Sequence, residues 1–222
     1  MTSKRLPLAI GEFYHVYNKS IADEDIFYNL KYLNKILEIV EYYRYDQRMK
    51  LSRFRRLRRS LQKDYLKDFK KSKLLIDIYS FSFMPNHFHF LLRQLEDNGI
   101  KKFLSNIQNS YAKCFNLINN RDGSLFLNSF KYKKINSEEV FIHVCRYIHL
   151  NSITSHFIEF DQLKNYPFSS YSWYLNNNLN RFINTGLVMN HFKSKENFTK
   201  FHQDQVDYQR RLKKINNLLL DG

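Results

Sequence analysis

The sequence predicts an α+β fold, in which helices cover an antiparallel β-sheet and one basic segment stands apart from the body. Short runs rich in Ile, Leu, Tyr and Phe, which suit strands, alternate with longer runs whose apolar period is near 3.6, which suits helices. Of the 222 residues, 43% are hydrophobic, enough to bury a core without disulfides. Glycine and proline are scarce, at 5 and 3 residues, which argues against a disordered chain.

The predicted elements occur in the order strand, helix, strand, strand, helix, strand, helix, and the first six match a ferredoxin-like, split βαβ core. The runs expected to form strands are residues 13–18, 74–83, 87–93 and 126–132. The runs with helical periodicity are residues 23–43, 97–120 and 137–155. Met84, Pro85 and Asn86 predict a tight turn, so the second and third strands should form a hairpin. Asn136 or Ser137 is the expected N-cap of the last helix.

The N-terminus and the cysteines indicate a cellular compartment. Residues 1–10 hold too short an apolar stretch for a signal peptide, and no run approaches the ~18 apolar residues of a membrane span. Cys114 and Cys145 lack a paired metal or redox spacing, which suits two free thiols in a reducing interior. We therefore expect a cytoplasmic protein with no membrane partner.

The net charge of +15 favours a polyanionic partner, nucleic acid before an anionic membrane surface. Residues 44–73 carry most of it, with thirteen basic and three acidic side chains. An apolar stripe with helical spacing runs through this segment: Phe54, Leu57, Leu61, Tyr65 and Phe69. The stripe predicts a helical arm packed on the body or on a partner chain. Its basic face is either solvated or in contact with DNA phosphates; a membrane-surface helix fits least, because nothing else in the chain suggests a membrane.

Two histidines, His87 and His89, lie two residues apart in a predicted strand and therefore share one face. Phe88 and Phe90 then face the opposite layer. Two imidazoles on one face can chelate a divalent metal. A His-x-His pair is also common as a structural feature, so this pattern alone leaves both interpretations open.

Tyr147 and Asn151 lie four residues apart on the last long predicted helix and share a face with Val140 and Val144. We therefore expect Tyr147 to point toward the core layer rather than to solvent. A buried tyrosine with a hydrogen-bonded hydroxyl is the structural alternative to a catalytic one. A buried amide needs partners, so the Asn151 oxygen is a candidate third ligand if the helix packs over the two histidines.

Several motifs occur in the order found in the single-tyrosine HUH transposases, where U is a bulky apolar residue. The run MPNHFHFLL at residues 84–92 resembles the HUH motif, and YIHLN at 147–151 resembles the tyrosine helix. The supporting motifs are YHVYN at 14–18, FN at 115–116 with GSLF at 123–126, and YPFSSY at 166–171. The set covers about residues 10–175 and is most similar to the REP-associated tyrosine transposases.

The sequence also departs from this family. Lys19 stands where the branch usually has Arg, and Ser152 follows Asn151 where Pro is usual. Residues 44–73 are longer than the usual link between the first helix and the second strand. The resemblance implies an HUH transposase or nuclease domain at residues 1–175, with the basic helical insertion at 44–73, and a C-terminal helical extension at 176–222.

The resemblance implies a metal-dependent reaction on DNA. His87, His89 and Asn151 would hold Mg²⁺ or Mn²⁺, and the ligand types alone would also allow Zn²⁺. Tyr147 would attack a phosphate of single-stranded or hairpin DNA and leave a 5′-phosphotyrosine and a free 3′-OH. The residues expected to contact DNA are Lys19, Arg55, Arg56, Arg59 and Lys63. Monomer and homodimer both stay open.

Two other functions fit the same residues. One is a catalytically inactive DNA-binding protein on the same fold, which would form no covalent adduct. The other is a metal-dependent phosphodiesterase that uses water and in which Tyr147 is structural. It would still cut DNA after the substitution Tyr147→Phe.

Overall fold

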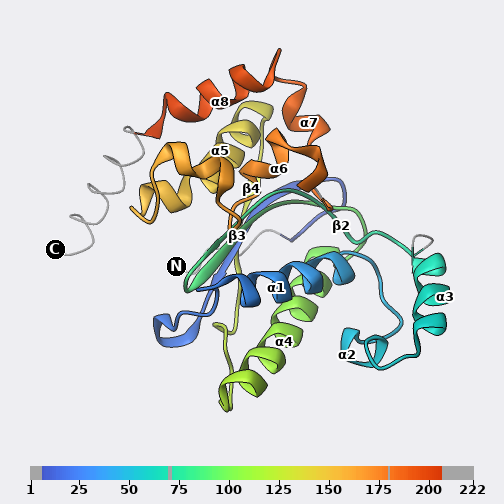
Figure 1. The fold of residues 1–222 in the computed structure, drawn as a ribbon. Helices are drawn as coiled ribbons and strands as arrows, with labels where there is room; N and C mark the ends of the chain where they lie inside the picture. Colours follow the sequence, from blue (N-terminus) through green and yellow to red (C-terminus); the bar gives the residue numbers. More distant parts are fainter. Residues whose placement is uncertain (1–6, 70–71, 180, 207–222) are drawn as a thin grey trace.

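A four-stranded antiparallel sheet forms the centre of the computed structural model, which describes residues 7–69, 72–179 and 181–206 (Figure 1). The strands are β1 (Phe13–Lys19), β2 (Ile76–Met84), β3 (His87–Gln94) and β4 (Lys131–Ile135). They lie in the order β2-β3-β1-β4, and each pair of neighbours is antiparallel. This order confirms the predicted ferredoxin-like core, with β1 and β3 at the centre and β4 at an edge.

Helices cover both faces of the sheet. On one face lie α1 (Leu30–Tyr43) and α4 (Gly99–Asn119), and on the other lies α5 (Glu138–Thr154) with the C-terminal helices (Figure 1). The C-terminal helices are α6 (Tyr171–Leu175), α7 (Gly186–Met189) and α8 (Lys195–Gln203). Short 3-10 turns complete the connections: η1 (Ile21–Asp23), η2 (Phe160–Asn165) and η3 (Asn177–Leu179). The C-terminal part of the predicted extension, residues 207–222, lies outside the described residues.

Alternation along β3 separates an apolar layer from a polar one. Phe88 and Phe90 are buried against the α1–α4 layer, where the Phe90 ring lies 6.0 Å from Phe103 of α4. His87 and His89 point to the other face, toward α5. The hairpin between β2 and β3 turns at Pro85 and Asn86, as the sequence predicts.

The first helix begins later than the sequence predicts. Residues 23–43 were expected to be helical, but α1 starts at Leu30, where the side chain of Asn29 accepts a hydrogen bond from the Tyr32 amide. Ile26 and Phe27 lie in the preceding loop, and both backbone amides donate to the Pro85 carbonyl. Both side chains are buried, so their apolar character reflects insertion into the core and not helical periodicity.

The fourth strand is displaced along the chain from its predicted position at residues 126–132. β4 begins only at Lys131, and Phe126 instead forms an isolated bridge with Ser20. The Phe126 ring is buried 6.2 Å from that of Tyr111, so this aromatic residue belongs to a loop that covers the core. β4 lies at an edge of the sheet and is rich in lysine, a residue common on edge strands.

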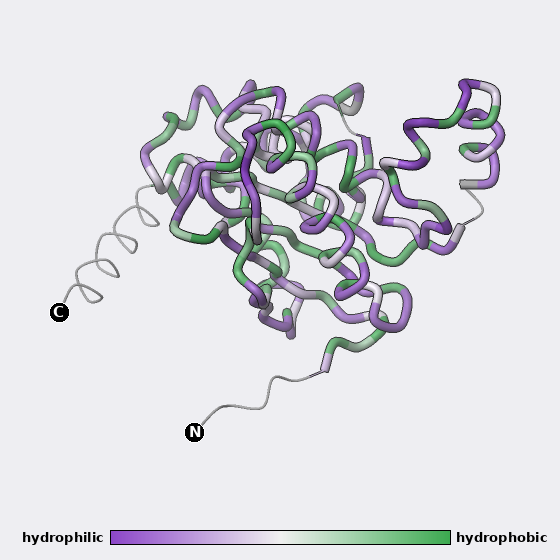
Figure 2. Tube along the Cα trace, turned by 90° about the horizontal axis from the view of Figure 1, so that it is seen from below, coloured by the Kyte–Doolittle hydropathy of each residue, from purple (hydrophilic) through white to green (hydrophobic). Residues whose placement is uncertain are grey.

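The basic segment forms an arm that leaves the body through a narrow neck. The Asp46 amide donates to the Lys73 carbonyl at 2.7 Å, and the Leu75 amide donates to the Arg44 carbonyl at 2.8 Å. The arm contains α2 (Leu51–Phe54) and α3 (Arg59–Phe69), which confirms its helical character. Hydrophilic residues dominate this projecting part of the chain (Figure 2).

The predicted apolar stripe of the arm is only partly correct. Phe54 and Tyr65 pack on α1, with ring centroids 5.6 and 6.5 Å from that of Tyr42. Leu61 is 52% exposed, so the stripe does not continue along α3. A helix that touches the body at one aromatic cluster cannot bury all of its apolar side. The Phe69 side chain and residues 70–71 lie outside the described part of the arm.

Two further sequence predictions concern the chemical environment. Cys114 and Cys145 are free, and Cys145 is buried, as expected for core thiols. Within the described ranges, no helix is both long and apolar enough to cross a membrane.

Candidate active site

The two histidines of the His-x-His pair lie side by side on the central strand β3. The ring centroids of His87 and His89 are 5.1 Å apart, and both side chains turn toward α5. The register of β3 with β1 places His87 opposite Lys19 and His89 opposite Tyr17. Strand geometry therefore fixes the spacing of the two imidazoles.

Both imidazoles make a hydrogen bond through Nδ1. His87 Nδ1 lies 2.6 Å from Asn86 Oδ1, an acceptor, so His87 carries a proton on that nitrogen. His89 Nδ1 lies 2.9 Å from His15 Nε2. Burial lowers the pKa of His15 to about 4, with the charge of Lys133 as the smaller cause, so His15 is neutral at pH 7 and can accept this bond. A neutral histidine that carries its proton on Nδ1 has its lone pair on Nε2, which is the arrangement that suits a metal ligand.

Tyr147 lies on α5 above the histidines. Its ring centroid is 5.8 Å from that of His15 and 6.0 Å from that of His89. The sequence predicts that Tyr147 points into the core, but it is 41% exposed, and Val140 on the same face is 44% exposed. This prediction is wrong because α5 buries its other sides, including Ile148, and leaves Tyr147 partly open to solvent above β1 and β3.

The hydroxyl of Tyr147 is nevertheless partly shielded from water. Burial raises its pKa, and the nearby Tyr17 raises it further. The ordinary pKa of a tyrosine is already about 10, so the Tyr147 hydroxyl is protonated at neutral pH. A reaction that uses its oxygen as a nucleophile therefore needs an activating group.

Asn151 follows Tyr147 by one turn on the same side of α5. Phe141 of α5 packs 5.0 Å from the first residue of β1, whereas Tyr147 packs beside His89. α5 therefore advances along the sheet toward the end of β3 that carries His87. Four helical residues advance about 6 Å, and two strand residues advance roughly 6.6 Å. By this progression, Asn151 reaches the level of His87 when Tyr147 stands at the level of His89.

The residues of this site fit a divalent metal ion. Asn151 is 5% exposed, and its Nδ2 atom has no hydrogen-bond partner among the described residues, a costly state for a buried amide. In the described part of the chain, no three His, Cys, Asp or Glu side chains form a metal-binding group, and an amide such as that of Asn151 would supply a ligand of another kind. Imidazole nitrogens suit Zn²⁺, and amide oxygens with water suit Mg²⁺ and Mn²⁺. Three protein donors leave positions open for phosphate oxygens.

A second pair of histidines lies buried on the opposite side of α5. His149 Nδ1 is 3.0 Å from His202 Nε2 of α8, and His149 Nε2 is 3.0 Å from Ser170 Oγ. His202 Nδ1 is 2.8 Å from the Phe198 carbonyl oxygen. This chain of hydrogen bonds is complete when both rings are neutral, and burial lowers the pKa of His202 to about 3 and that of His149 well below its usual value. His149 thus joins α5 to α8 and contacts neither His87 nor His89.

Lys19, expected to contact DNA, lies at the end of β1 next to the histidine pair. It is exposed, and its ammonium group forms an ion pair with Asp23 at 2.5 Å. An exposed pair of this kind contributes little to stability, so a phosphate can compete with Asp23 for the lysine.

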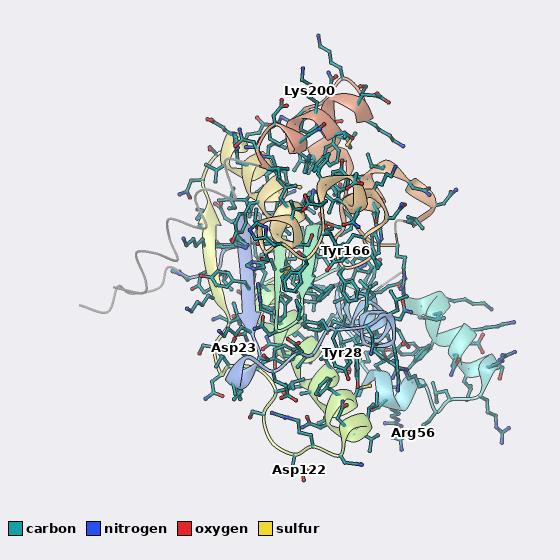
Figure 3. The ribbon with its side chains drawn as sticks, turned by 60° about the vertical axis from the view of Figure 1, so that its left-hand side comes forward. Asp23, Tyr28, Arg56, Asp122, Tyr166 and Lys200 are labelled. Carbon is teal, nitrogen blue, oxygen red and sulfur yellow. The ribbon has the colours of Figure 1, made fainter. Side chains whose placement is uncertain are left out.

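The arm residues expected to contact DNA differ in their environments. Arg55 makes a two-point contact with Glu38, at 2.9 and 2.6 Å, which compensates its charge within the chain. Arg56, Arg59 and Lys63 are exposed and make no ion pair with any other described residue. Figure 3 shows Arg56 on the arm, well away from the sheet.

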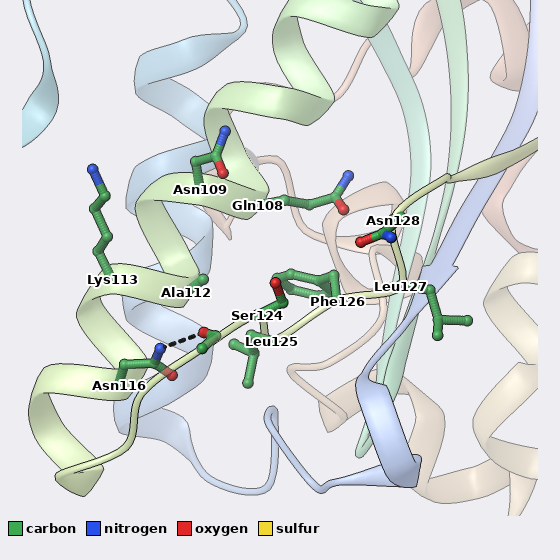
Figure 4. A pocket seen from close by; sticks show the side chains of 11 residues that line it. Gln108, Asn109, Ala112, Lys113, Asn116, Ser124, Leu125, Phe126, Leu127 and Asn128 are labelled. Atoms are coloured by element: carbon green, nitrogen blue, oxygen red, sulfur yellow. Dashed lines mark hydrogen bonds between the residues drawn. The ribbon is translucent and has the colours of Figure 1, made fainter.

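A polar cavity of about 410 Å³ lies between α4 and residues 123–128, on the far side of the sheet from Tyr147 (Figure 4). Two of its amide side chains are bonded within the protein. Asn116 donates to the Gly123 carbonyl at 2.8 Å, and Gln108 accepts from Asn18 at 2.7 Å. The first bond fixes the loop on α4, the second joins α4 to β1, and the cavity is separate from the histidine site.

The sheet order, the histidine pair on β3 and the tyrosine on α5 define a protein of the HUH transposase class. A family model described as "Transposase IS200 like" matches residues 35–151, more than half of the chain. The chain belongs to this family of IS200-like transposases, which confirms the resemblance seen in the sequence.

The fold is also similar to that of a solved structure described as "Structure of the REP associates tyrosine transposase bound to a REP hairpin". The TM-score is 0.55 and the sequence identity is 13%, over 82% of this chain and 89% of that chain. No curated protein matches the sequence significantly.

Strand alternation alone does not show that His15, Tyr17 and the lysines of β4 lie on the face of the histidine pair. His15 and Tyr17 alternate along β1 and share a face, but only the pairing of β1 with β3 shows that this is the face of His89. Lys131 and Lys133 follow the same alternation in β4. The alternation with a period of two shows which residues of one strand share a face. The strand order, which the alternation does not give, shows that this is the face of His89.

Proposed function

We propose that the protein is a transposase that cuts and rejoins hairpin-forming DNA, single-stranded at the cut, through a covalent link to Tyr147. The observation that carries the proposal is the position of Tyr147, which is 41% exposed and lies 6.0 Å from His89 between ring centroids. The hairpin bound to the similar structure supports hairpin DNA as the substrate class. Membership of the IS200-like transposase family supports the reaction class.

His87, His89 and Asn151 would hold a divalent metal ion, which when bound polarises the scissile phosphate and stabilises its developing charge. The hydrogen bonds between His87 and Asn86 and between His89 and His15 orient the two imidazoles. Such partners of metal ligands fix the ring orientation and the tautomer.

The covalent step uses the Tyr147 oxygen as the nucleophile. It forms a bond to phosphorus while the bond from phosphorus to the 3′ oxygen breaks. The tyrosine proton is lost, and the departing 3′ oxygen gains one. The 5′ phosphate is then linked to Tyr147, and a second 3′-OH can attack it to rejoin DNA without an external energy source.

In the presence of Mn²⁺, we expect the protein to become covalently attached to the 5′ phosphate of a cut hairpin oligonucleotide, and we expect EDTA to prevent this. Denaturing gels with DNA labelled separately on each side of the cut measure the reaction. Asn151→Ala should raise the Mn²⁺ concentration for half-maximal adduct at least about tenfold, because it removes a proposed ligand. Asn109→Ala, an exposed amide on α4, is the control and should leave this concentration unchanged.

Each outcome of this experiment separates the alternatives. Tight binding with no adduct at any metal concentration would favour the inactive DNA-binding protein. Cut DNA without protein attached would favour the water-dependent phosphodiesterase. An adduct on the 3′ side of the cut would contradict the proposed polarity.

We also propose that the arm holds the DNA backbone outside the cut through Arg56, Arg59 and Lys63, with a smaller contribution from Arg55. Replacing the first three with Ser should weaken binding and reduce the slope of log K against log salt by up to about 2, at about 0.7 per phosphate contact on a single strand. Arg55→Ser should change the slope less, because Glu38 already compensates Arg55. Fluorescence anisotropy over a salt series measures both effects.

The position of the cut should not move in these arm variants, since phosphate contacts carry little sequence information. An unchanged salt slope in the triple variant would show that the arm is only solvated. A displaced cut would show that the arm reads sequence, which contradicts the proposed role.

A further inference from the structure

The face of the sheet that carries the histidines continues across β1 to β4, where it presents two lysines. The register pairs Tyr17 with His89 on one side and with Lys131 on the other. It also pairs His15 with Lys133. Lys131 and Lys133 therefore share the face of His89, and two strand spacings separate β4 from β3, about 10 Å.

The charged side chains that β1 and β4 contribute to this face are Lys19, Lys131 and Lys133, and Lys19 is paired with Asp23. On this side, the described strands β1, β3 and β4 contribute no Asp or Glu. Lys131 and Lys133 are exposed, and neither forms an ion pair with another described residue. The adjacent Lys134 points to the opposite face and pairs with Glu12 at 3.1 Å.

Tyr17 provides an aromatic ring between the histidines and the lysines. It is stacked with His15 and His89, with centroid distances of 5.2 and 5.5 Å. It is only half-buried, so part of the ring is accessible from solvent. Proteins that bind single-stranded nucleic acid combine such rings, on which bases stack, with cationic side chains that contact the backbone.

We propose that Tyr17, Lys131 and Lys133 form a track that binds the unpaired DNA strand next to the phosphate attacked by Tyr147. This inference rests on the proposed function and adds the path of the substrate. A strand that crosses from the histidine pair over β1 to β4 places a base on Tyr17 and backbone phosphates beside the two lysines. Lysines on an edge strand also prevent pairing between sheets of different molecules, but that role requires no common face with a reactive site.

The track predicts losses of affinity that depend on unpaired DNA. Lys131→Ser and Lys133→Ser should each weaken binding to a hairpin with a single-stranded flank about fivefold at 0.1 M salt, from a slope change of 0.7 over a tenfold range of salt. A blunt hairpin without the flank should bind as it does to the unmodified protein. Lys134→Ser removes the same charge from the same strand, but on the opposite face of the sheet. Its affinity for both hairpins should stay within about twofold of that of the unmodified protein.

The aromatic part of the track is tested by a second pair of variants. Tyr17→Ser should weaken binding to the flanked hairpin at least about fivefold, because stacking contributes about 1–3 kcal/mol per base. Tyr17→Phe keeps the ring and should restore the affinity. All affinities are measured by fluorescence anisotropy in EDTA, so that no DNA is cut.

Unchanged binding in the Lys131 and Lys133 variants would overturn the track, and so would an equal loss in Lys134→Ser. Failure of the proposed function gives a different result, because the binding assay requires no cutting. If the unmodified protein forms no adduct, but the lysine variants still lose affinity for the flanked hairpin, the proposed function fails and the track stands. If the unmodified protein forms the adduct, and both lysine variants bind the flanked hairpin with unchanged affinity, the track is refuted and the proposed function stands.

Discussion

Replacing Tyr147 with Phe should abolish the covalent protein–DNA adduct and leave hairpin binding within about twofold of the unmodified protein. The substitution removes the oxygen that attacks phosphorus and keeps the ring that packs against His15 and His89. Loss of a nucleophile typically lowers the rate by more than roughly a thousandfold. Adduct formation on denaturing gels and binding by anisotropy measure the two properties separately.

Tyr132→Phe is the matched control, because Tyr132 lies on β4 and faces the layer opposite to the site. It should retain both binding and adduct formation. An adduct formed by the Tyr147→Phe variant would mean that another residue is the nucleophile. Cutting without an adduct in that variant would mean that water attacks and that Tyr147 is structural.

Acidification below pH 6.5 should destabilise the fold steeply through the buried pair His149 and His202. Both folded-state pKa values lie below the usual 6.5, that of His202 at about 3. The unfolded chain therefore takes up protons that the folded chain excludes, so the stabilisation is complete above pH 6.5 and is lost as the pH falls. Two protons bound on unfolding give a slope of about 3 kcal/mol per pH unit. Urea unfolding followed by circular dichroism between pH 7 and 4.5 measures it.

The variant His202→Phe isolates this contribution from that of the carboxylates. It should lower stability at pH 7 by about 1–3 kcal/mol, since it leaves the buried His149 Nδ1 proton without an acceptor. It should also reduce the pH slope by about 1.4 kcal/mol per unit, the share of one proton. His156→Asn, at an exposed position with a positive φ of 58°, should change neither quantity. An unchanged slope in His202→Phe would contradict the origin assigned to the acid sensitivity.

The strand and helix order was predictable because alternation and the period of 3.6 are local properties of the chain. The hairpin at Pro85 and Asn86 is an example, since the turn chemistry and both strands are adjacent in sequence. Ile26, Phe27 and Phe126 were misassigned because each is an apolar loop residue buried in the core. Local patterns record that such residues are buried, but not by which neighbours.

The candidate site was predictable only as far as its motifs extend. The shared face of His87 and His89 follows from strand geometry, and the separation of His149 from that face follows from helix geometry. The exposure of Tyr147 did not follow, because it depends on which side of α5 the C-terminal helices cover. The contact between His15 and His89 joins residues 74 positions apart, and no local pattern reports it.

The narrow neck of the arm has an evolutionary consequence. Backbone hydrogen bonds between Asp46 and Lys73 and between Arg44 and Leu75 close the segment where it leaves the body. The entropic free-energy cost of closing a loop grows slowly with its length. A segment joined at such a point can therefore lengthen or shorten with little effect on the stability of the sheet. The arm is therefore a replaceable module. A change in the length of the arm leaves the histidines and the tyrosine in register.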